Sequence, residues 1–347
     1  MGYTDRVLAF EEEDAVERTD RIVGCLLGGA VGDALGAPTE FLAWSQIRSR
    51  YGDKGIVDLE EAYGRMGAIT DDTQMTLFTV EGVLAALEDS DWTIGSVTVE
   101  VHRAYLRWLI TQGVRPPIDP GPVLGLVENE MLSQRRAPGM TCLSALREAT
   151  VLGARAMNDS KGCGGVMRTA PLGFLGEAAY KLGCRAAAVT HGHRSGWTSA
   201  GALAHLIHRL DQGVGLTEAI EDVVGHTAED SDAEEVHRAL VRAVDLSRVS
   251  VSGPPTPREL GEGWVGEEAL AIAVWCALRH GDDPAQAVRV AANHSGDTDS
   301  TASITGQILG AFRGTHWLDE FDLANLELRD EIDTLAMRLA EAVAVSP

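Results

Sequence analysis

Two short segments concentrate carboxylate and hydroxyl oxygens directly before helical patterns. "AITDDTQMTLF" and "NHSGDTDSTASITG" each bring such side chains close together, at Thr70, Asp71 and Asp72 in the first and at Asp297, Asp299 and Ser300 in the second. Oxygens of these types are hard ligands that suit Mg²⁺ or Mn²⁺. Two-metal sites hold their ions about 3.5–4 Å apart between shared carboxylates. The two segments therefore predict a pair of divalent cations held between two helix starts.

Helix capping is the simpler interpretation of either segment taken alone. Thr70 is a good N-cap, and Asp71 and Asp72 in the first turn would favour the positive end of the helix dipole. Capping does not require adjacent carboxylates, however, and these repel each other unless a cation lies between them. For one segment the two interpretations are equally good. Two such segments in one chain favour metal binding.

Charge and composition exclude several classes of protein. The 347 residues include 29 basic and 52 acidic ones, a net charge of −23, which disfavours non-specific binding to nucleic acid or to an anionic membrane. The five cysteines form no C-x-x-C pair, so neither a disulfide framework nor a zinc site is indicated. No apolar run of about 18 residues occurs, and the N-terminal segment does not have the pattern of an export signal. We expect a cytoplasmic protein.

Helical spacing dominates the rest of the chain. Apolar residues recur three and four positions apart, as on one helix face, in the segments 22–35, 73–89, 143–157, 199–211, 267–281 and 302–314. The segment 54–61 could hold one short strand, and 112–122 and 250–266 have the glycine and proline content of loops. The pattern predicts an all-α fold. We expect a compact single domain over residues 19–347, preceded by an extension over residues 1–18.

Two of the predicted helices carry small residues at every fourth position. The two series are Gly24, Gly28, Gly32 and Gly36, and Ala302, Gly306, Gly310 and Gly314. Glycine inside a helix costs about 1 kcal/mol relative to alanine, so these positions require a structural reason. In a globular protein that reason is close packing of one helix backbone on another. We expect these two helices to be central and their ends to meet at the functional site.

A glycine-rich segment and a pair of histidines allow more than one interpretation. In "SKGCGGVMR" the glycines leave backbone amides free to approach an anion. The spacing alone favours an ordinary loop, because it matches neither a Walker A sequence nor a dinucleotide fingerprint. His191 and His193 could be metal ligands, a general acid or base, or polar residues at a helix start. They lie two positions apart and cannot share one helix face, which argues against a metal-binding pair.

The motifs together resemble the ADP-ribosylglycohydrolase family, which includes the dinitrogenase-reductase-activating glycohydrolase and the ADP-ribosyl-acceptor hydrolases. The matching segments are "GCLLGGAVGDALGAPTEF", "GAITDDTQMTLFTVEGVL", "SKGCGGVMRTAPLG", "VTHGH" and "SGDTDSTASITGQILGA", in this order. The resemblance implies a compact all-α fold with a binuclear Mg²⁺ or Mn²⁺ centre. It also implies an enzyme that removes ADP-ribose from modified acceptors.

Carried over by position, the resemblance assigns roles to single residues. It implies that the metal ligands are Thr70, Asp71, Asp72, Asp297, Asp299 and Ser300, the last of which stands where many relatives have threonine. Glu40 matches an acidic residue that in some relatives approaches the metals and acts as a gate or general base, although a surface glutamate would also fit the sequence. Asp33 is expected to be a buried partner that orients the site.

The glycine-rich segment also gains a role from the resemblance, because in relatives it lines the pocket for ADP-ribose. The implied substrate contacts are Gly162, Gly164, Gly165, Met167 and His191. Arg168, by contrast, is expected to pair with a carboxylate.

These roles imply a metal-dependent hydrolase with an ADP-ribosylated protein or another ADP-ribose conjugate as substrate and ADP-ribose as product. A modified arginine is the leading acceptor, and serine-, base- and O-linked conjugates stay open. A phosphoesterase with the same ligands, and a non-catalytic ADP-ribose-binding or crystallin-like protein on the same scaffold, are the alternatives from other classes. A monomer is the default expectation.

Overall fold

The structure is a computed structural model that describes residues 3–123, 125–250 and 256–345, with side chains from residue 17 onward. Its described residues form thirteen α-helices and one two-stranded antiparallel hairpin, β1 (Glu61–Ala62) with β2 (Arg65–Met66). The helices are α1 (Tyr3–Gly36), α2 (Trp44–Tyr51), α3 (Asp71–Leu87), α4 (Ile94–Thr111), α5 (Met140–Glu148), α6 (Ala179–Ala188), α7 (Arg194–Asp211), α8 (Leu216–Glu229), α9 (Glu234–Ser247), α10 (Gly266–His280), α11 (Pro284–Ala291), α12 (Thr298–Arg313) and α13 (Arg329–Val345). The prediction of an all-α fold is confirmed.

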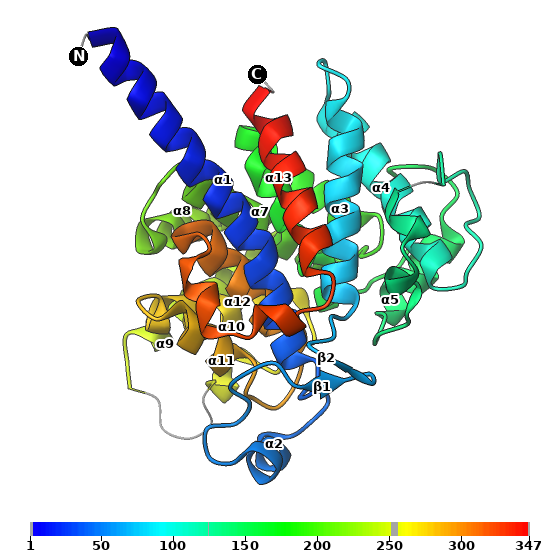
Figure 1. Ribbon diagram of the computed structural model, residues 1–347. Coiled ribbons are helices and arrows are strands. Elements are labelled where there is room, and N and C mark those ends of the chain that lie inside the picture. The colour runs from blue at the N-terminus through cyan, green and yellow to red at the C-terminus, as the bar shows by residue number, and fades with distance from the viewer. Residues whose placement is uncertain (1–2, 124, 251–255, 346–347) are drawn as a thin grey trace.

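Helices α1 and α12 lie against each other at the centre of the molecule (Figure 1). A Cβ atom added at Gly28 would collide with the backbone carbonyl of Gly306, and one at Gly24 with that of Gly310. At Gly32 the obstacle is the backbone of Ala302. The two small-residue series thus face each other in an antiparallel crossing. This confirms the expectation that the small residues are there because two central helix backbones touch.

The other helices cover this pair, so that α12 is buried on all sides. Every residue of α12 from 298 to 311 is buried, as expected for a helix at the centre of a large core. Helices α3 and α13 pack on α1, and α10 and α11 pack on α12. Figure 1 shows α4 and α5 on one side of this core, and α8 and α9 on the other. None of the described helices combines the length and apolar character that crossing a bilayer demands.

Two predicted elements differ from the structure. The helix expected over 143–157 ends at Glu148, because Ala149 is extended and Gly153 adopts a positive φ of 72° that a helix does not allow. The strand expected within 54–61 is displaced to Glu61–Ala62 and is only two residues long. It pairs through a tight turn at Tyr63 and Gly64, both with positive φ.

Loops and boundaries follow the sequence more closely. The segment 112–122 is a loop as predicted. The described part of 250–266 is a loop with one short 3₁₀ turn, Arg258–Leu260, up to Gly266, which begins α10; residues 251–255 lie outside the described part of the chain. The proposed boundary between residues 18 and 19 falls inside α1, which continues through it. That boundary stays a prediction.

Candidate functional site

The site lies where the end of α1 meets the starts of α3 and α12. Gly36 closes the α1 series, and a Cβ atom added there would collide with the backbone of Asp299. Asp297 is the N-cap of α12 and accepts a hydrogen bond from the backbone nitrogen of Ser300 at 3.3 Å. Thr70 is the N-cap of α3 and accepts one from the backbone nitrogen of Asp72 at 3.3 Å. Each predicted oxygen cluster therefore contains the N-cap of a helix, and both lie at the end of α1.

The turn that follows α1 brings Glu40 to the start of α12. Oxygen atoms of Glu40, Asp297 and Asp299 all lie within 4.8 Å of one another. Thr39 holds this turn in place, since its hydroxyl lies 3.0 Å from the hydroxyl of Thr298 and donates to the carbonyl of Ala292 at 3.0 Å. A glutamate from one segment thus joins two aspartates from another, as a shared cation would require.

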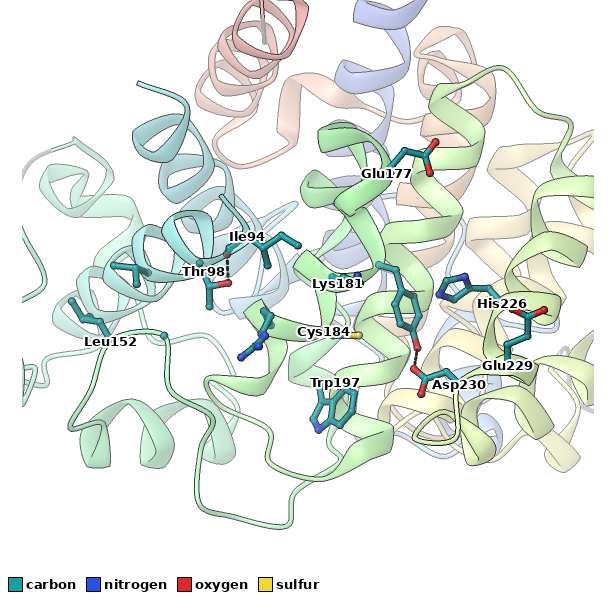
Figure 2. A pocket seen from close by; sticks show the side chains of 15 residues that line it. Ile94, Thr98, Leu152, Glu177, Lys181, Cys184, Trp197, His226, Glu229 and Asp230 are labelled. Atoms are coloured by element: carbon teal, nitrogen blue, oxygen red, sulfur yellow. Dashed lines mark hydrogen bonds between the residues drawn. The ribbon is translucent and has the colours of Figure 1, made fainter. Parts of the chain in front are cut away.

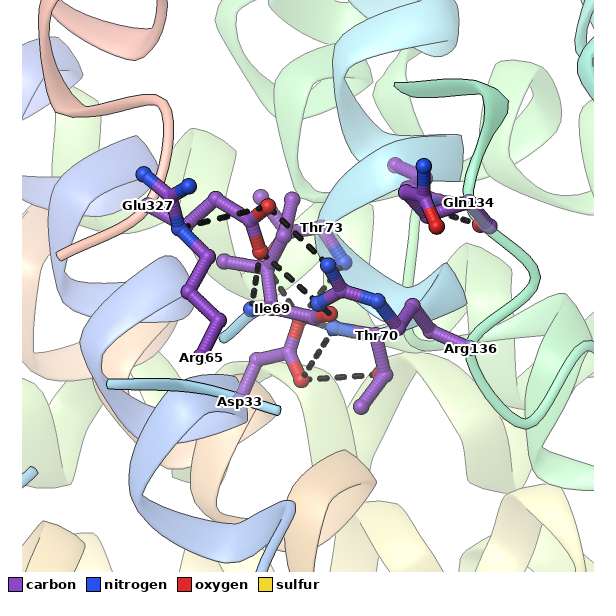
Figure 3. Close-up of polar contacts among 9 residues, drawn as sticks. Asp33, Arg65, Ile69, Thr70, Thr73, Gln134, Arg136 and Glu327 are labelled. Atoms are coloured by element: carbon purple, nitrogen blue, oxygen red, sulfur yellow. Dashed lines mark hydrogen bonds and ion pairs between the residues drawn. The ribbon is translucent and has the colours of Figure 1, made fainter. Parts of the chain in front are cut away.

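Asp33 connects the α1 end to the α3 start, as Figure 3 shows. Its carboxylate accepts hydrogen bonds from the backbone and hydroxyl of both Thr70 and Thr73. With all these donors satisfied, Asp33 orients the α3 start, in line with the expectation of a buried partner. The neighbouring Asp71 accepts from the backbone nitrogen of Gly139 at 3.0 Å.

Burial and mutual repulsion make the carboxylates of this site hard to ionise. Burial, followed by the charge of Asp299, raises the pKa of Asp33 to about 7 and the pKa of Glu40 to about 11. One carboxylate oxygen each of Glu40, Asp72 and Asp297 is buried without a hydrogen-bond partner. Burial likewise raises the pKa of the remaining aspartates of the site, Asp71, Asp72, Asp297 and Asp299.

Such an arrangement fits divalent cations. A cluster of buried carboxylates with unpartnered oxygens is costly unless positive charge compensates it. Carboxylate and hydroxyl oxygens are the donors that Mg²⁺ and Mn²⁺ prefer. The donor set of the two helix caps and Glu40 therefore fits the cations expected from the sequence.

The predicted substrate-contacting residues also come together. The glycine-rich segment forms a 3₁₀ turn, Cys163–Gly165. The ring of the buried His191 lies behind it, 3.3–3.4 Å from the positions that Cβ atoms on Gly162, Gly164 and Gly165 would occupy. Burial, and then the charge of Arg168, lowers the pKa of His191 to about 3. His191 is thus a neutral support for the turn.

Met167 and Arg168 follow the turn into the core. Met167 is buried, and its carbonyl accepts a hydrogen bond from the side chain of Gln307 in α12 at 2.7 Å. The expectation that Arg168 pairs with a carboxylate was wrong for the described residues. Its guanidinium donates to the hydroxyl of Thr190 at 2.6 Å and lies 4.1 Å from the centre of the Tyr105 ring. Hydroxyl, sulfur and aromatic groups surround this arginine.

A buried ion pair near the α3 start escaped the sequence analysis. Arg136 binds both carboxylate oxygens of Glu327, at 2.8 and 3.1 Å, and the same glutamate accepts from the backbone nitrogen of Ile69 at 3.1 Å (Figure 3). The Arg136 guanidinium also lies 5.5 Å from the centre of the Tyr63 ring. No local pattern could reveal the pair, because its members are 191 positions apart.

A second hollow lies away from this site. A cavity of about 850 Å³ is lined by parts of α4, α6, α7 and α8, with Lys181, Trp197 and His226 among its residues (Figure 2). Its acidic Asp230 is already bonded to the hydroxyl of Tyr180 at 2.6 Å. The predicted site residues are not among the described residues that line it. The convergent carboxylates, rather than the presence of a cavity, identify the candidate site.

Comparison with known proteins gives concordant matches over most of the chain. The sequence profile of the family ADP-ribosylglycohydrolase matches residues 14–347. The chain is similar to ADP-ribosylhydrolase ARH3 of Bos taurus, at 27% identity over 94% of this chain and 93% of that protein. It is also similar to ADP-ribosyl-[dinitrogen reductase] glycohydrolase of Rhodospirillum rubrum, at 25% identity over 91% and 95%. A solved "ADP-ribosylglycohydrolase-related protein complex" superposes with a TM-score of 0.68 at 26% identity, covering 94% of this chain and 99% of that one.

Proposed function

The chain belongs to the ADP-ribosylglycohydrolase family, and we propose that it is a metal-dependent hydrolase that releases ADP-ribose from ADP-ribosylated arginine on proteins. The family and its relatives support removal of ADP-ribose from an acceptor. The observation that carries the metal dependence is the meeting of Glu40, Asp297 and Asp299 within 4.8 Å. The start of α3, which Asp33 bonds to the end of α1, adds its own carboxylates.

Two divalent cations, Mg²⁺ or Mn²⁺, bound at this site would supply positive charge to organise the substrate and polarise the reacting groups. The proposed ligands are the residues of the two helix caps: Thr70, Asp71, Asp72, Asp297, Asp299 and Ser300. Asp33 holds the first cap, and the Gly36 contact holds the second. The helices thereby fix the distance between the two halves of the ligand set.

Glu40 is the proposed general base. It lies on a turn rather than on a helix, and burial raises its pKa to about 11 in the absence of positive charge. Compensation by cations would return the carboxylate to its ionised form, which could then take the proton of the attacking water. A partly desolvated carboxylate beside the reacting centre suits this role.

The turn at residues 162–165 is the proposed binding site for the ADP-ribose. Gly162 is partly exposed, whereas Gly164 and Gly165 are buried and pack closely on Cys142 and Gly196, with the His191 ring beside all three. The chain has a net charge of −23, so a pyrophosphate needs local positive potential from cations and backbone amides. The negative net charge of the chain also favours a cationic leaving group such as arginine. The cytoplasmic location and monomeric state expected from the sequence stay predictions.

Release of ADP-ribose from matched conjugates tests this proposal. The purified protein would be incubated with arginine-linked and serine-linked ADP-ribose in Mg²⁺, in Mn²⁺ and with chelator. We expect metal-dependent release from the arginine conjugate. Asp299→Asn should abolish turnover without unfolding the protein, whereas Glu234→Gln, whose side chain is 76% exposed on α9, should behave as wild type.

Other outcomes of the same assay discriminate the alternatives. Release only from the serine conjugate would overturn the arginine assignment. Tight binding of ADP-ribose with no cleavage of any conjugate would replace the hydrolase by a binding protein. Normal activity in Asp299→Asn would overturn the assignment of the site.

A further inference from the structure

The turn at residues 162–165 consists mostly of glycine, so its own side chains do little to fix its shape. Glycine loses more conformational freedom on folding than any other residue. Lys161, Gly162 and Cys163 are partly exposed, whereas Gly164 and Gly165 are buried. The end of the turn that a ligand can reach is therefore the end next to Lys161, and its shape must be set by the residues around it.

The backbone around Lys161 is bonded to the segment that leads into α10. The backbone nitrogen of Cys163 donates to the carbonyl of Trp264 at 3.2 Å, and the backbone nitrogen of Gly266 donates to the carbonyl of Lys161 at 2.8 Å. The two segments thus form an isolated antiparallel bridge. The position of the exposed end of the turn depends on the position of the α10 start.

The Lys161 side chain connects the same turn to two helix starts. Its ammonium donates to the carboxylate of Glu235 in the first turn of α9 at 2.9 Å, and to the carboxylate of Glu267 in the first turn of α10. Glu235 also accepts a hydrogen bond from the hydroxyl of Ser195 in α7 at 2.6 Å. Hydrogen bonds from Ser195 and then from Lys161 lower the pKa of Glu235 to about 2, so this carboxylate stays ionised.

Glu267 ties the ammonium of Lys161 to this position. Glu267 is 7% exposed, and its Oε2 atom is buried without a hydrogen-bond partner among the described residues. A buried carboxylate that loses its cation is strongly unfavourable. The single positive charge of Lys161 faces two carboxylates, Glu235 and Glu267, so it is already compensated. This arrangement suits a residue that fixes the turn better than one that attracts a pyrophosphate directly.

We propose that Lys161 is a positioning residue for the ADP-ribose site, which fixes the glycine-rich turn through its ion pairs with Glu235 and Glu267. The inference rests on the proposed function for its effect on turnover, whereas its effect on ADP-ribose binding can be measured without catalysis. A binding segment that is already ordered avoids an entropic cost when the ligand binds. For one short segment that cost corresponds to roughly a tenfold change in affinity.

Substitution of Lys161 tests the proposal. Calorimetry with free ADP-ribose in Mg²⁺ gives the Kd, and release of ADP-ribose from the arginine conjugate gives kcat and KM. Lys161→Met should raise Kd and KM roughly tenfold while kcat and the Mn²⁺ affinity stay unchanged, because the carboxylate cluster lies on other helix starts. Lys161→Arg keeps a cation for both carboxylates and should recover wild-type values. Lys181→Met, at an exposed position of α6, is the matched control.

Two results with these variants would contradict the role of Lys161. Wild-type Kd and KM in Lys161→Met would show that the turn does not need the ion pairs. An equal loss of kcat and of Mn²⁺ affinity would show a general disturbance of the fold in place of an effect on the turn.

Glu235→Gln separates positioning from direct contact with the ligand. The amide oxygen of the glutamine can still accept from Ser195, but the ion pair with Lys161 is lost. If Lys161 positions the turn, Glu235→Gln should weaken ADP-ribose binding. If the ammonium contacted the pyrophosphate itself, the same change would leave it less compensated and binding would become tighter. Tighter or unchanged binding therefore overturns the proposal, with Glu234→Gln, whose side chain is 76% exposed, as the control.

The double variant Lys161→Met with Glu267→Gln addresses loss of stability. It leaves no buried carboxylate without its cation, so its thermal unfolding should lie closer to wild type than that of Lys161→Met. The Kd for ADP-ribose should nevertheless stay raised. Recovery of the wild-type Kd in the double variant would attribute the weakening to the uncompensated charge of Glu267, and the positioning role would be wrong.

The role of Lys161 and the proposed function fail in distinguishable ways. Weaker ADP-ribose binding in Lys161→Met, with no release of ADP-ribose from any conjugate by the wild-type protein, would overturn the proposed function alone. Metal-dependent release with the same KM in Lys161→Met and wild type would overturn the role of Lys161 alone.

Discussion

Asp33 and Thr70 are joined by two kinds of hydrogen bond: the Asp33 carboxylate accepts from the Thr70 backbone nitrogen at 2.9 Å and from its hydroxyl at 2.8 Å (Figure 3). Asp33 lies in the last turn of α1, and Thr70 is the N-cap of α3. The same carboxylate accepts from the backbone and hydroxyl of Thr73. One aspartate therefore fixes both the position of the α3 start and the direction in which its carboxylates point.

Asp33→Asn should weaken cation binding while leaving the fold intact. An asparagine has only one acceptor oxygen, and its amide hydrogens would face the backbone N–H groups of Thr70 and Thr73. We expect a loss of about 1–3 kcal/mol in stability. Mn²⁺ affinity should fall by roughly 10–100-fold, as is typical when a residue that orients metal ligands is replaced.

Calorimetry with Mn²⁺ and thermal unfolding measure the two effects of Asp33→Asn. The control is Asp89→Asn, at an exposed loop position, which should change neither. Unchanged Mn²⁺ affinity in Asp33→Asn would show that Asp33 does not orient the ligands.

Features of the fold and site that repeat locally could be predicted from the sequence. Small residues at every fourth position predicted a close helix crossing, since only small residues allow two backbones to touch. Helices α1 and α12 form that crossing. The hydroxyl–carboxylate segments predicted helix starts, and Thr70 and Asp297 are indeed N-caps. In both cases the determining residues lie within one or a few helical turns.

Features that depend on distant pairing could not be predicted in this way. Arg136 and Glu327 meet only after the fold is complete, and so do Lys161 and Glu235. The end of α5 was missed for a related reason. The apolar spacing continues past Glu148, although the backbone there is already extended. Periodicity reports which side chains are apolar and does not report where the backbone leaves the helix.

Gly32→Ala should destabilise the protein through the central helix crossing. The new Cβ would overlap the backbone of Ala302, and neither helix can shift without disturbing the other contacts of the series. Overpacking of this kind costs about 1–3 kcal/mol or more. Gly225→Ala is the matched control: Gly225 lies in α8, and a Cβ atom there would meet no atom within 4 Å.

The two alanine substitutions should change stability in opposite directions. Alanine is favoured over glycine in a helix by about 1 kcal/mol, so Gly225→Ala should raise the free energy of unfolding in urea while Gly32→Ala lowers it. Equal changes in the free energy of unfolding for Gly32→Ala and Gly225→Ala would contradict the idea that the crossing requires a small residue at Gly32.

Removal of one member of the Arg136–Glu327 pair should cost more than removal of both. Glu327→Leu leaves the guanidinium of Arg136 buried without its carboxylate, a situation that typically costs about 3–5 kcal/mol. In the double variant Arg136→Met with Glu327→Leu, no buried charge is left unpaired. Urea unfolding should therefore show the double variant to be more stable than Glu327→Leu. A double variant that is less stable than either single one would indicate that the pair stabilises the α3 start beyond charge compensation.

Stability should also depend on pH through His102, which is 1% exposed. Its Nδ1 atom accepts a hydrogen bond from the backbone nitrogen of Gly153 at 3.0 Å, so protonation at Nδ1 would break that bond. Burial, and then the charge of Arg168, lowers the pKa of His102 from 6.5 to about 4. Between these values the unfolded chain binds a proton that the folded protein does not.

The contribution of His102 to stability is therefore complete above pH about 6.5 and is lost as the pH falls toward 4, at about 1.4 kcal/mol per pH unit. His102→Gln keeps an acceptor for Gly153 and removes the titration. Urea unfolding in chelator should show a larger loss of stability between pH 7 and pH 4.5 in wild type than in His102→Gln. His316→Gln, at an exposed position, should follow wild type. If His102→Gln and wild type lost stability in parallel, the neutral state of His102 would not be what the fold requires.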